Sequence, residues 1–105
     1  NLKKVSRLLN SYLNYIKRNP RPNYWPCRVW IEVTSNCNLE CPLCPNRDME
    51  PEQKGFMDYG LFTDIIDQLG SRVNDIYLFH RGEPFLHPQL MDMIGYAKKT
   101  PATVR

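Results

Sequence analysis

The sequence lacks a long apolar run, an internal repeat and an even scatter of cysteines, and each absence excludes a class of protein. No stretch approaches the ~20 consecutive apolar residues of a transmembrane helix, so we expect no membrane span. Four unevenly placed cysteines are not the framework of a disulfide-stapled domain. Residues 1–6 lack the apolar core of a signal peptide, and there is no initiator Met, so we expect the sequence to begin inside a longer gene product.

Acidic residues are absent from the first 28 positions. This segment holds seven of the 14 lysines and arginines, whereas all 11 acids lie in the remaining 77 residues. Pro20 and Pro22 restrict the backbone before them and end any helix. Residues 1–26 are therefore predicted to be a basic amphipathic helix and a proline-rich linker. An apolar residue recurs every three or four positions, at Leu2, Val5, Leu9, Tyr12, Leu13 and Ile16.

The role of this basic helix stays open at the level of the sequence. Its charged face is expected to be solvated or docked on the acidic remainder of the chain, with the helix closing the bottom of a barrel. Binding of a leader peptide or RNA is the alternative.

Three of the four cysteines lie within eight residues. Cys37, Cys41 and Cys44 follow a strand-like run with the spacing C-x3-C-x2-C. Thiolates this close on one loop can converge on a soft metal centre. Iron–sulfur clusters usually take four cysteines, so three would leave one iron with an open position. Cys27 precedes the strand, whose seven extended residues span about 23 Å, and is expected to be a buried free thiol at the opposite end.

Two other kinds of site compete with this interpretation. An electron-transfer iron–sulfur module would want a fourth nearby cysteine. A structural zinc site would need closed tetrahedral coordination, using Cys27 with His80 or His87.

The chain after the cysteines alternates helix and strand signals. Asp58 is a suitable N-cap for a helix with an apolar stripe over residues 61–69, and Gly70 is placed to end it. Residues 75–80 form a near-continuous apolar run typical of a buried strand. A second helix is expected over residues 88–99, followed by the start of a third strand. Strand, helix and strand in this order predict a right-handed parallel crossover.

The run Thr34-Ser35-Asn36-Cys37-Asn38-Leu39-Glu40-Cys41-Pro42-Leu43-Cys44-Pro45 resembles the cluster loop of radical S-adenosylmethionine (SAM) enzymes. The resemblance implies that the three cysteines bind a 4Fe–4S cluster, whose fourth iron is chelated by SAM. It also implies reductive cleavage of SAM to a 5′-deoxyadenosyl radical, which abstracts hydrogen from a substrate. The expected partners are a flavodoxin- or ferredoxin-like electron donor and an unidentified substrate, either a small molecule, a peptide or RNA. Such a loop fits the reducing cytoplasm.

A second segment, Gly82-Glu83-Pro84, resembles the family's glycine–glutamate turn. Gly82 permits close backbone approach, and the resemblance implies that Glu83 contacts the amino group of SAM. The residue before the third cysteine is often aromatic in the family and packs near the adenine. Here it is Leu43, which can give a similar apolar contact.

The predicted fold is α/β, a partial parallel (β/α) TIM-like barrel. Residues 27–105 would form the first part of the radical SAM core, as an N-terminal fragment, because a whole barrel runs to about 250 residues. Ligand sites of such barrels lie at the carboxyl ends of the strands, so the cysteine loop and the Gly82–Pro84 turn should share one rim. Near that rim, Glu32, His80 and Arg81 are candidates for substrate contacts or for structural roles.

Overall fold

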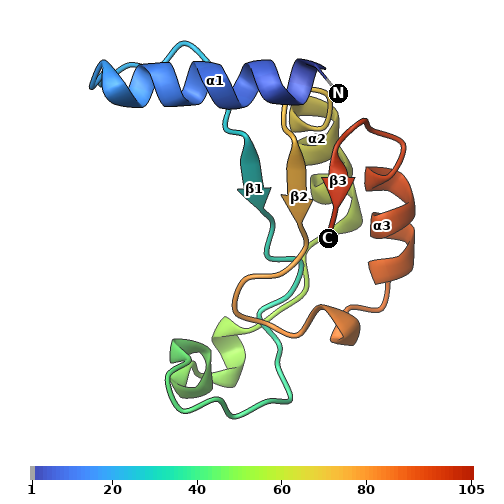
Figure 1. Ribbon diagram of the computed structural model, residues 1–105. Helices are drawn as coiled ribbons and strands as arrows, with labels where there is room; N and C mark the ends of the chain where they lie inside the picture. Colours follow the sequence, from blue (N-terminus) through green and yellow to red (C-terminus); the bar gives the residue numbers. More distant parts are fainter. Residues whose placement is uncertain (1) are drawn as a thin grey trace.

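The computed structural model describes residues 2–105 as a three-stranded sheet with two helices packed on one face (Figure 1). Strands β1 (Arg28–Trp30), β2 (Asp75–Tyr77) and β3 (Thr103–Val104) lie in the order β1-β2-β3, and both pairs are parallel. Helix α2 (Tyr59–Leu69) connects β1 to β2, and α3 (Leu90–Ala97) connects β2 to β3. This confirms the predicted α/β class and the parallel pairing.

The hydrophobic core lies between the sheet and these two helices. Alternate residues of the first strand region, Ile31 and Val33, point into it, whereas the preceding Trp30 is exposed on the other face. Its other buried members are Phe62, Ile66, Val73, Ile76, Leu78, Leu90, Met93 and Ala97.

Helix α2 begins and ends where the sequence predicts. The side chain of Asp58 accepts a hydrogen bond from the Leu61 N–H at 3.0 Å, which satisfies one of the free donors of the first turn. Gly70 ends the helix with a right-handed backbone, φ −57°. An added Cβ there would overlap Thr100, so close packing, and not a left-handed turn, requires glycine.

Helix α3 is held from both ends. The buried His87 ring lies 3.0 Å from the Met57 carbonyl oxygen through Nε2, and its Nδ1 accepts from the Gln89 N–H at 3.0 Å. Both ring nitrogens of His87 are therefore engaged within the fold, one of them on the residue that precedes α3. Farther along, the Tyr96 hydroxyl donates to Asp67 of α2 at 2.9 Å, and this hydrogen bond raises the pKa of Tyr96.

Both long strands are shorter than predicted. The sequence indicates strands over 28–34 and 75–80, whereas the ladder between them ends with the Ile31 N–H donating to the Tyr77 carbonyl oxygen at 2.8 Å. Beyond that point the two segments separate, and the Leu78 N–H donates to the Arg105 carbonyl oxygen beside β3 at 3.0 Å. Thr34 pairs instead with Phe56 in an isolated antiparallel bridge.

Helix α1 (Leu2–Ile16) runs across the amino ends of the strands, away from the cysteine loop (Figure 1). The guanidinium of Arg7 anchors it, donating to the carbonyl oxygens of Ser71 at 2.6 Å and Val73 at 3.0 Å. The Lys4 ammonium donates to Thr103 at 2.7 Å. The predicted helix is confirmed, but none of its residues is buried, and its apolar stripe stays exposed. Across residues 2–105, no helix is long and apolar enough to cross a membrane.

Candidate metal centre

The cysteine loop leaves the carboxyl end of β1 and is pinned at its base. The Ser35 N–H donates to the Gly55 carbonyl oxygen at 3.0 Å, and the Met57 N–H donates to Val33 at 2.8 Å. The Thr34 hydroxyl adds a bond to Gly55 at 2.9 Å. In segment 35–57 the apolar residues follow neither a helical nor a strand spacing. The structure places two short 3-10 helices there, Pro45–Asp48 and Pro51–Gln53.

The three clustered cysteines are free thiols on this loop. Cys41 is exposed, whereas Cys37 and Cys44 are half-buried. The Cys44 N–H donates to the Cys41 carbonyl oxygen at 3.0 Å, which makes a tight turn between these two residues. The Leu39 N–H donates to Cys37 Sγ at 3.4 Å.

Within residues 2–105, no three Cys, His, Asp or Glu side chains lie where they could together hold a metal ion. The three thiols therefore share a loop but do not converge on one point. Their chemistry still fits an iron–sulfur cluster, because all three are unpaired thiols within eight residues of one another. A cluster would require the loop to draw them together.

Cys27 lies at the other end of the strand. It directly precedes β1, and its carbonyl oxygen accepts from the Asn74 N–H at 2.8 Å. Its thiol is half-buried, and not fully buried as the sequence predicts. Its position is the expected one, at the opposite end of the strand from the cysteine loop.

The Gly82–Pro84 turn packs directly on the base of the cysteine loop. The Glu83 N–H donates to the Asn36 carbonyl oxygen at 2.9 Å, one residue before Cys37. A Cβ added to Gly82 would overlap the Thr34 carbonyl oxygen. The two predicted segments therefore meet on one rim, and glycine is required for their contact.

The side chains expected to contact SAM are placed differently from one another. The half-buried Glu83 carboxylate accepts from the Phe85 N–H at 3.1 Å and caps the 3-10 helix Pro84–Leu86. Leu43 is 98% exposed at the outer end of the loop, with no protein neighbour covering it. The Glu83 carboxylate is thus already hydrogen-bonded within the protein, whereas the Leu43 side chain is exposed over nearly its whole surface.

We expect Gly82→Ala to destabilise the protein by about 1–3 kcal/mol, because its methyl group would have to displace the Thr34 backbone. Chemical denaturation measures this change. Gly95→Ala is the matched control, since Gly95 lies in α3 with open space around it and alanine should stabilise by about 0.4–1 kcal/mol. Equal effects at the two positions would contradict the close contact at Gly82.

Two residues near the rim make contacts that the sequence does not reveal. The Glu32 carboxylate accepts from the Arg81 N–H at 3.1 Å, which ties the end of β1 to the start of the Gly82–Pro84 turn. Asn46 is buried under the loop and donates from Nδ2 to the Ser35 carbonyl oxygen at 2.9 Å. No sequence pattern marks Asn46, because its partner is a backbone atom eleven residues away.

The sheet face opposite the helices is aromatic and charged. Trp30 and Tyr77 stack with ring centroids 4.8 Å apart. Beside them Asp75 accepts from Arg28 at 3.4 Å and lies 3.7 Å from Arg105. In the sequence, apolar residues alternate with others over 28–34, which predicts one sheet face packed on helices and the other facing a polar lumen. This is the face predicted to line the lumen.

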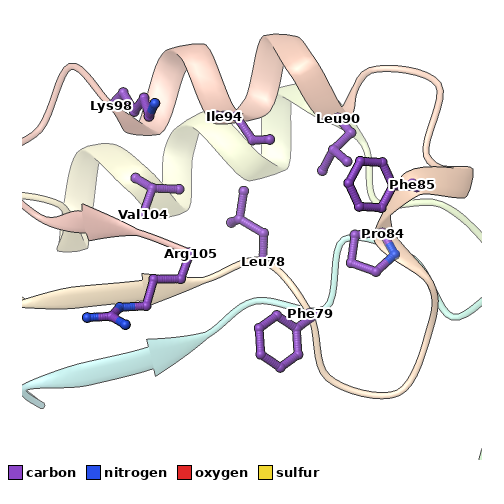
Figure 2. A pocket seen from close by; sticks show the side chains of 9 residues that line it. All are labelled: Leu78, Phe79, Pro84, Phe85, Leu90, Ile94, Lys98, Val104 and Arg105. Carbon is purple, nitrogen blue, oxygen red and sulfur yellow. The ribbon is translucent and has the colours of Figure 1, made fainter.

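An apolar cavity of about 290 Å³ opens on the other side, between the ends of β2 and β3 and helix α3 (Figure 2). Leu78 and Phe79 lie on opposite sides of the extended chain there, and Phe85 and Leu90 close one end. None of its lining residues belongs to the cysteine loop. Pro84 of the Gly82–Pro84 turn does line it, so the cavity adjoins the rim from the side of α3.

Comparisons with known proteins identify relatives. The tungsten-containing aldehyde ferredoxin oxidoreductase cofactor-modifying protein of Pyrococcus furiosus is 41% identical over 73 residues, or 68% of this chain and 20% of that protein. The PqqA peptide cyclase of Streptomyces rochei is 32% identical over 79 residues, or 75% of this chain and 22% of that protein. No family model matches the chain.

Among solved structures, BtrN in complex with AdoMet and 2-DOIA is similar, with a TM-score of 0.68 and 27% sequence identity. The match covers 76% of this chain and 34% of the BtrN chain. The chain thus spans about a fifth of the length of the two curated relatives. BtrN is a radical SAM enzyme, as are the curated relatives, and the fragment of its fold that matches is the one described above. With the cysteine loop and the glycine–glutamate turn in place, the chain belongs to the radical SAM superfamily.

Proposed function

We propose that this chain carries the cluster site of a radical SAM enzyme, with Cys37, Cys41 and Cys44 as the ligands of a 4Fe–4S cluster. The observation that carries the proposal is the meeting of the cysteine loop and the Gly82–Pro84 turn on one rim, through the Glu83–Asn36 bond of 2.9 Å. The cofactors are SAM and the cluster, as in BtrN and the related radical SAM enzymes. When bound, the cluster supplies the electron that cleaves SAM to methionine and a 5′-deoxyadenosyl radical.

The residues of the rim would bind and orient SAM. Glu83 offers a carboxylate to the SAM ammonium, and its bond to the Phe85 N–H fixes the direction of that carboxylate. Gly82 and Pro84 would bring the backbone of the turn close to SAM, and Leu43 would offer an exposed apolar side chain to its adenine. Together they would place SAM over the three thiolates.

The sheet is proposed to continue beyond β3 into a TIM-like partial barrel. The chain spans only 34% of the BtrN chain, and the apolar stripe of α1 is exposed at the amino ends of the strands. Further strands would cover that stripe, so that α1 closes the bottom of the barrel. The aromatic and charged sheet face would then line the lumen.

This arrangement predicts that polar substitutions in the apolar stripe of α1 lower the free energy of unfolding. In the complete protein, Leu9→Gln and Leu13→Gln should each destabilise by about 1.5–3 kcal/mol if later strands bury these side chains. Lys3→Gln, on the exposed basic side of the same helix, should change stability by less than about 0.5 kcal/mol. The free energy of unfolding from denaturant titration measures all three. Three equally small effects would show that nothing covers the stripe.

The electron donor would be a flavodoxin- or ferredoxin-like protein, and the enzyme would work in the cytoplasm. The substrate would be a small molecule, a peptide or RNA, and the residues that select it would lie in the rest of the barrel. Anaerobic reconstitution followed by iron, sulfide and zinc analysis tests the proposal. About four irons and four sulfides per chain support it, whereas stoichiometric zinc without sulfide would indicate a structural zinc module.

A further inference from the structure

Asn46 is a buried side chain of the cysteine segment whose hydrogen bonding is incomplete. It is 2% exposed, and its Nδ2 donates to the Ser35 carbonyl oxygen at 2.9 Å. Its Oδ1 is the only buried side-chain nitrogen or oxygen without a partner in the described part of the chain. Buried polar atoms are almost always paired, because an unpaired one loses its hydration without compensation. The unpaired Oδ1 therefore calls for a donor.

The bond to Ser35 spans the cysteine loop at its base. Ser35 lies two residues before Cys37, and Asn46 lies two residues after Cys44. On the Asn46 side, the backbone is ordered by the Arg47 N–H donating to the Cys44 carbonyl oxygen at 3.2 Å. One side chain thus fixes both arms of the loop that presents the three thiols.

The missing donor can be identified by chemistry. The sulfides and thiolates of an iron–sulfur cluster carry no N–H or O–H group, so the cluster itself cannot supply it. Backbone N–H groups of the loop can. Among residues 2–105, the backbone N–H groups of Asn38, Glu40 and Cys41 have no hydrogen-bond acceptor, whereas that of Leu39 bonds Cys37 Sγ.

We propose that Asn46 positions the cysteine loop for the cluster. Nδ2 holds the base of the loop through Ser35, and Oδ1 accepts the backbone N–H of Asn38, Glu40 or Cys41 when the three thiolates converge. Asn46 is a positioning residue, because it acts on the ligands and does not touch iron. The inference rests on the proposed function and adds a residue outside the cysteines to the machinery that retains the cluster.

The test compares Asn46→Ala with Asn38→Ala in the complete, anaerobically reconstituted protein. Asn38 is the matched control, an exposed asparagine on the same loop whose side chain makes no bond in the described residues. Iron transfer to a chelator should be about 10-fold faster for Asn46→Ala, which loses two hydrogen bonds. Asn38→Ala should stay within about twofold of the unsubstituted protein.

A second measurement separates positioning from a general loss of stability. The melting temperature of Asn46→Ala should fall more in the cluster-loaded protein than in the cluster-free protein, because Oδ1 is paired only in the loaded form. Equal shifts in both forms, or unchanged iron release, would overturn the inference. An effect that appears only after SAM is added would also overturn it, since the donor would then be SAM. If the unsubstituted protein held no cluster, the proposed function would fail before any variant was compared.

Discussion

Replacing Cys37, Cys41 or Cys44 with Ala should abolish the iron–sulfur cluster in each case, whereas Cys27→Ala should leave it intact. The three residues share a loop at the carboxyl end of β1, and Cys27 precedes the amino end of that strand. A cluster bound through three thiolates has no spare protein ligand, so removal of one leaves an iron undercoordinated. Iron and sulfide content and the cluster's visible absorption measure the loss.

The Cys27→Ala variant is the internal control of this series. It removes a thiol from the same protein at a half-buried position, and Cys37 and Cys44 are also half-buried. Cluster content equal to that of the unsubstituted protein is the expected result. Equal loss in all four variants would contradict the three-ligand assignment and would favour a site that uses Cys27.

Glu83→Gln should weaken SAM binding by roughly 1.5–3 kcal/mol, the range for a hydrogen bond to a charged group. Glutamine keeps an oxygen that accepts from the Phe85 N–H, so the 3-10 helix that follows should stay capped. The substitution therefore removes the negative charge and preserves the local backbone. The dissociation constant of SAM, measured anaerobically by equilibrium dialysis on the cluster-loaded protein, should rise by about 10- to 100-fold.

Glu40→Gln is the matched control for charge. Glu40 is exposed and lies between Cys37 and Cys41, so the substitution removes the same charge from the cysteine loop itself. We expect it to change SAM affinity by less than about threefold, since an exposed charge is screened. The same loss in both variants would show that net charge near the loop, and not a contact from Glu83, governs binding.

Local signals predicted the elements of this fold well where one feature decides the outcome. Asp58 caps α2 as predicted, because a short acidic side chain before an apolar stripe bonds the first free N–H groups. The apolar stripe predicted over residues 61–69 matches the buried face of α2 less well. Leu61 is 52% exposed, whereas Phe62 and Ile66 fill the core, since a helix of this length turns only one narrow face to the sheet.

The strand lengths could not be read from the sequence. Ile31 and Val33 are buried, as the alternation of apolar residues predicts, but the ladder ends at Ile31, and the next residue of the partner segment, Leu78, bonds to Arg105 instead. Pairing depends on where a neighbouring chain runs, which no single stretch encodes. Met93 shows the same limit in α3. The spacing of apolar residues predicts a stripe of Leu90, Ile94 and Ala97, yet Met93 is fully buried and Ile94 is only half-buried.

The meeting of the two segments of the candidate site on one rim was predicted, but the contacts that hold them there were not. The spacing of the cysteines and the glycine–glutamate turn identified the two segments, and the structure brings them together. Asn46 and the Glu32–Arg81 bond were missed, because both join a side chain to a backbone atom far away in the sequence. Such contacts exist only after folding and leave no local pattern.

The most direct test of the account is the formation of 5′-deoxyadenosine. The complete protein, loaded with its cluster and freed of oxygen, is incubated with SAM and dithionite, and the products are separated by chromatography. Methionine and 5′-deoxyadenosine should form with the unsubstituted protein and with Cys27→Ala, and neither should form with Cys41→Ala. A protein that holds a full 4Fe–4S cluster and binds SAM, yet yields no 5′-deoxyadenosine, would contradict the proposed radical SAM activity.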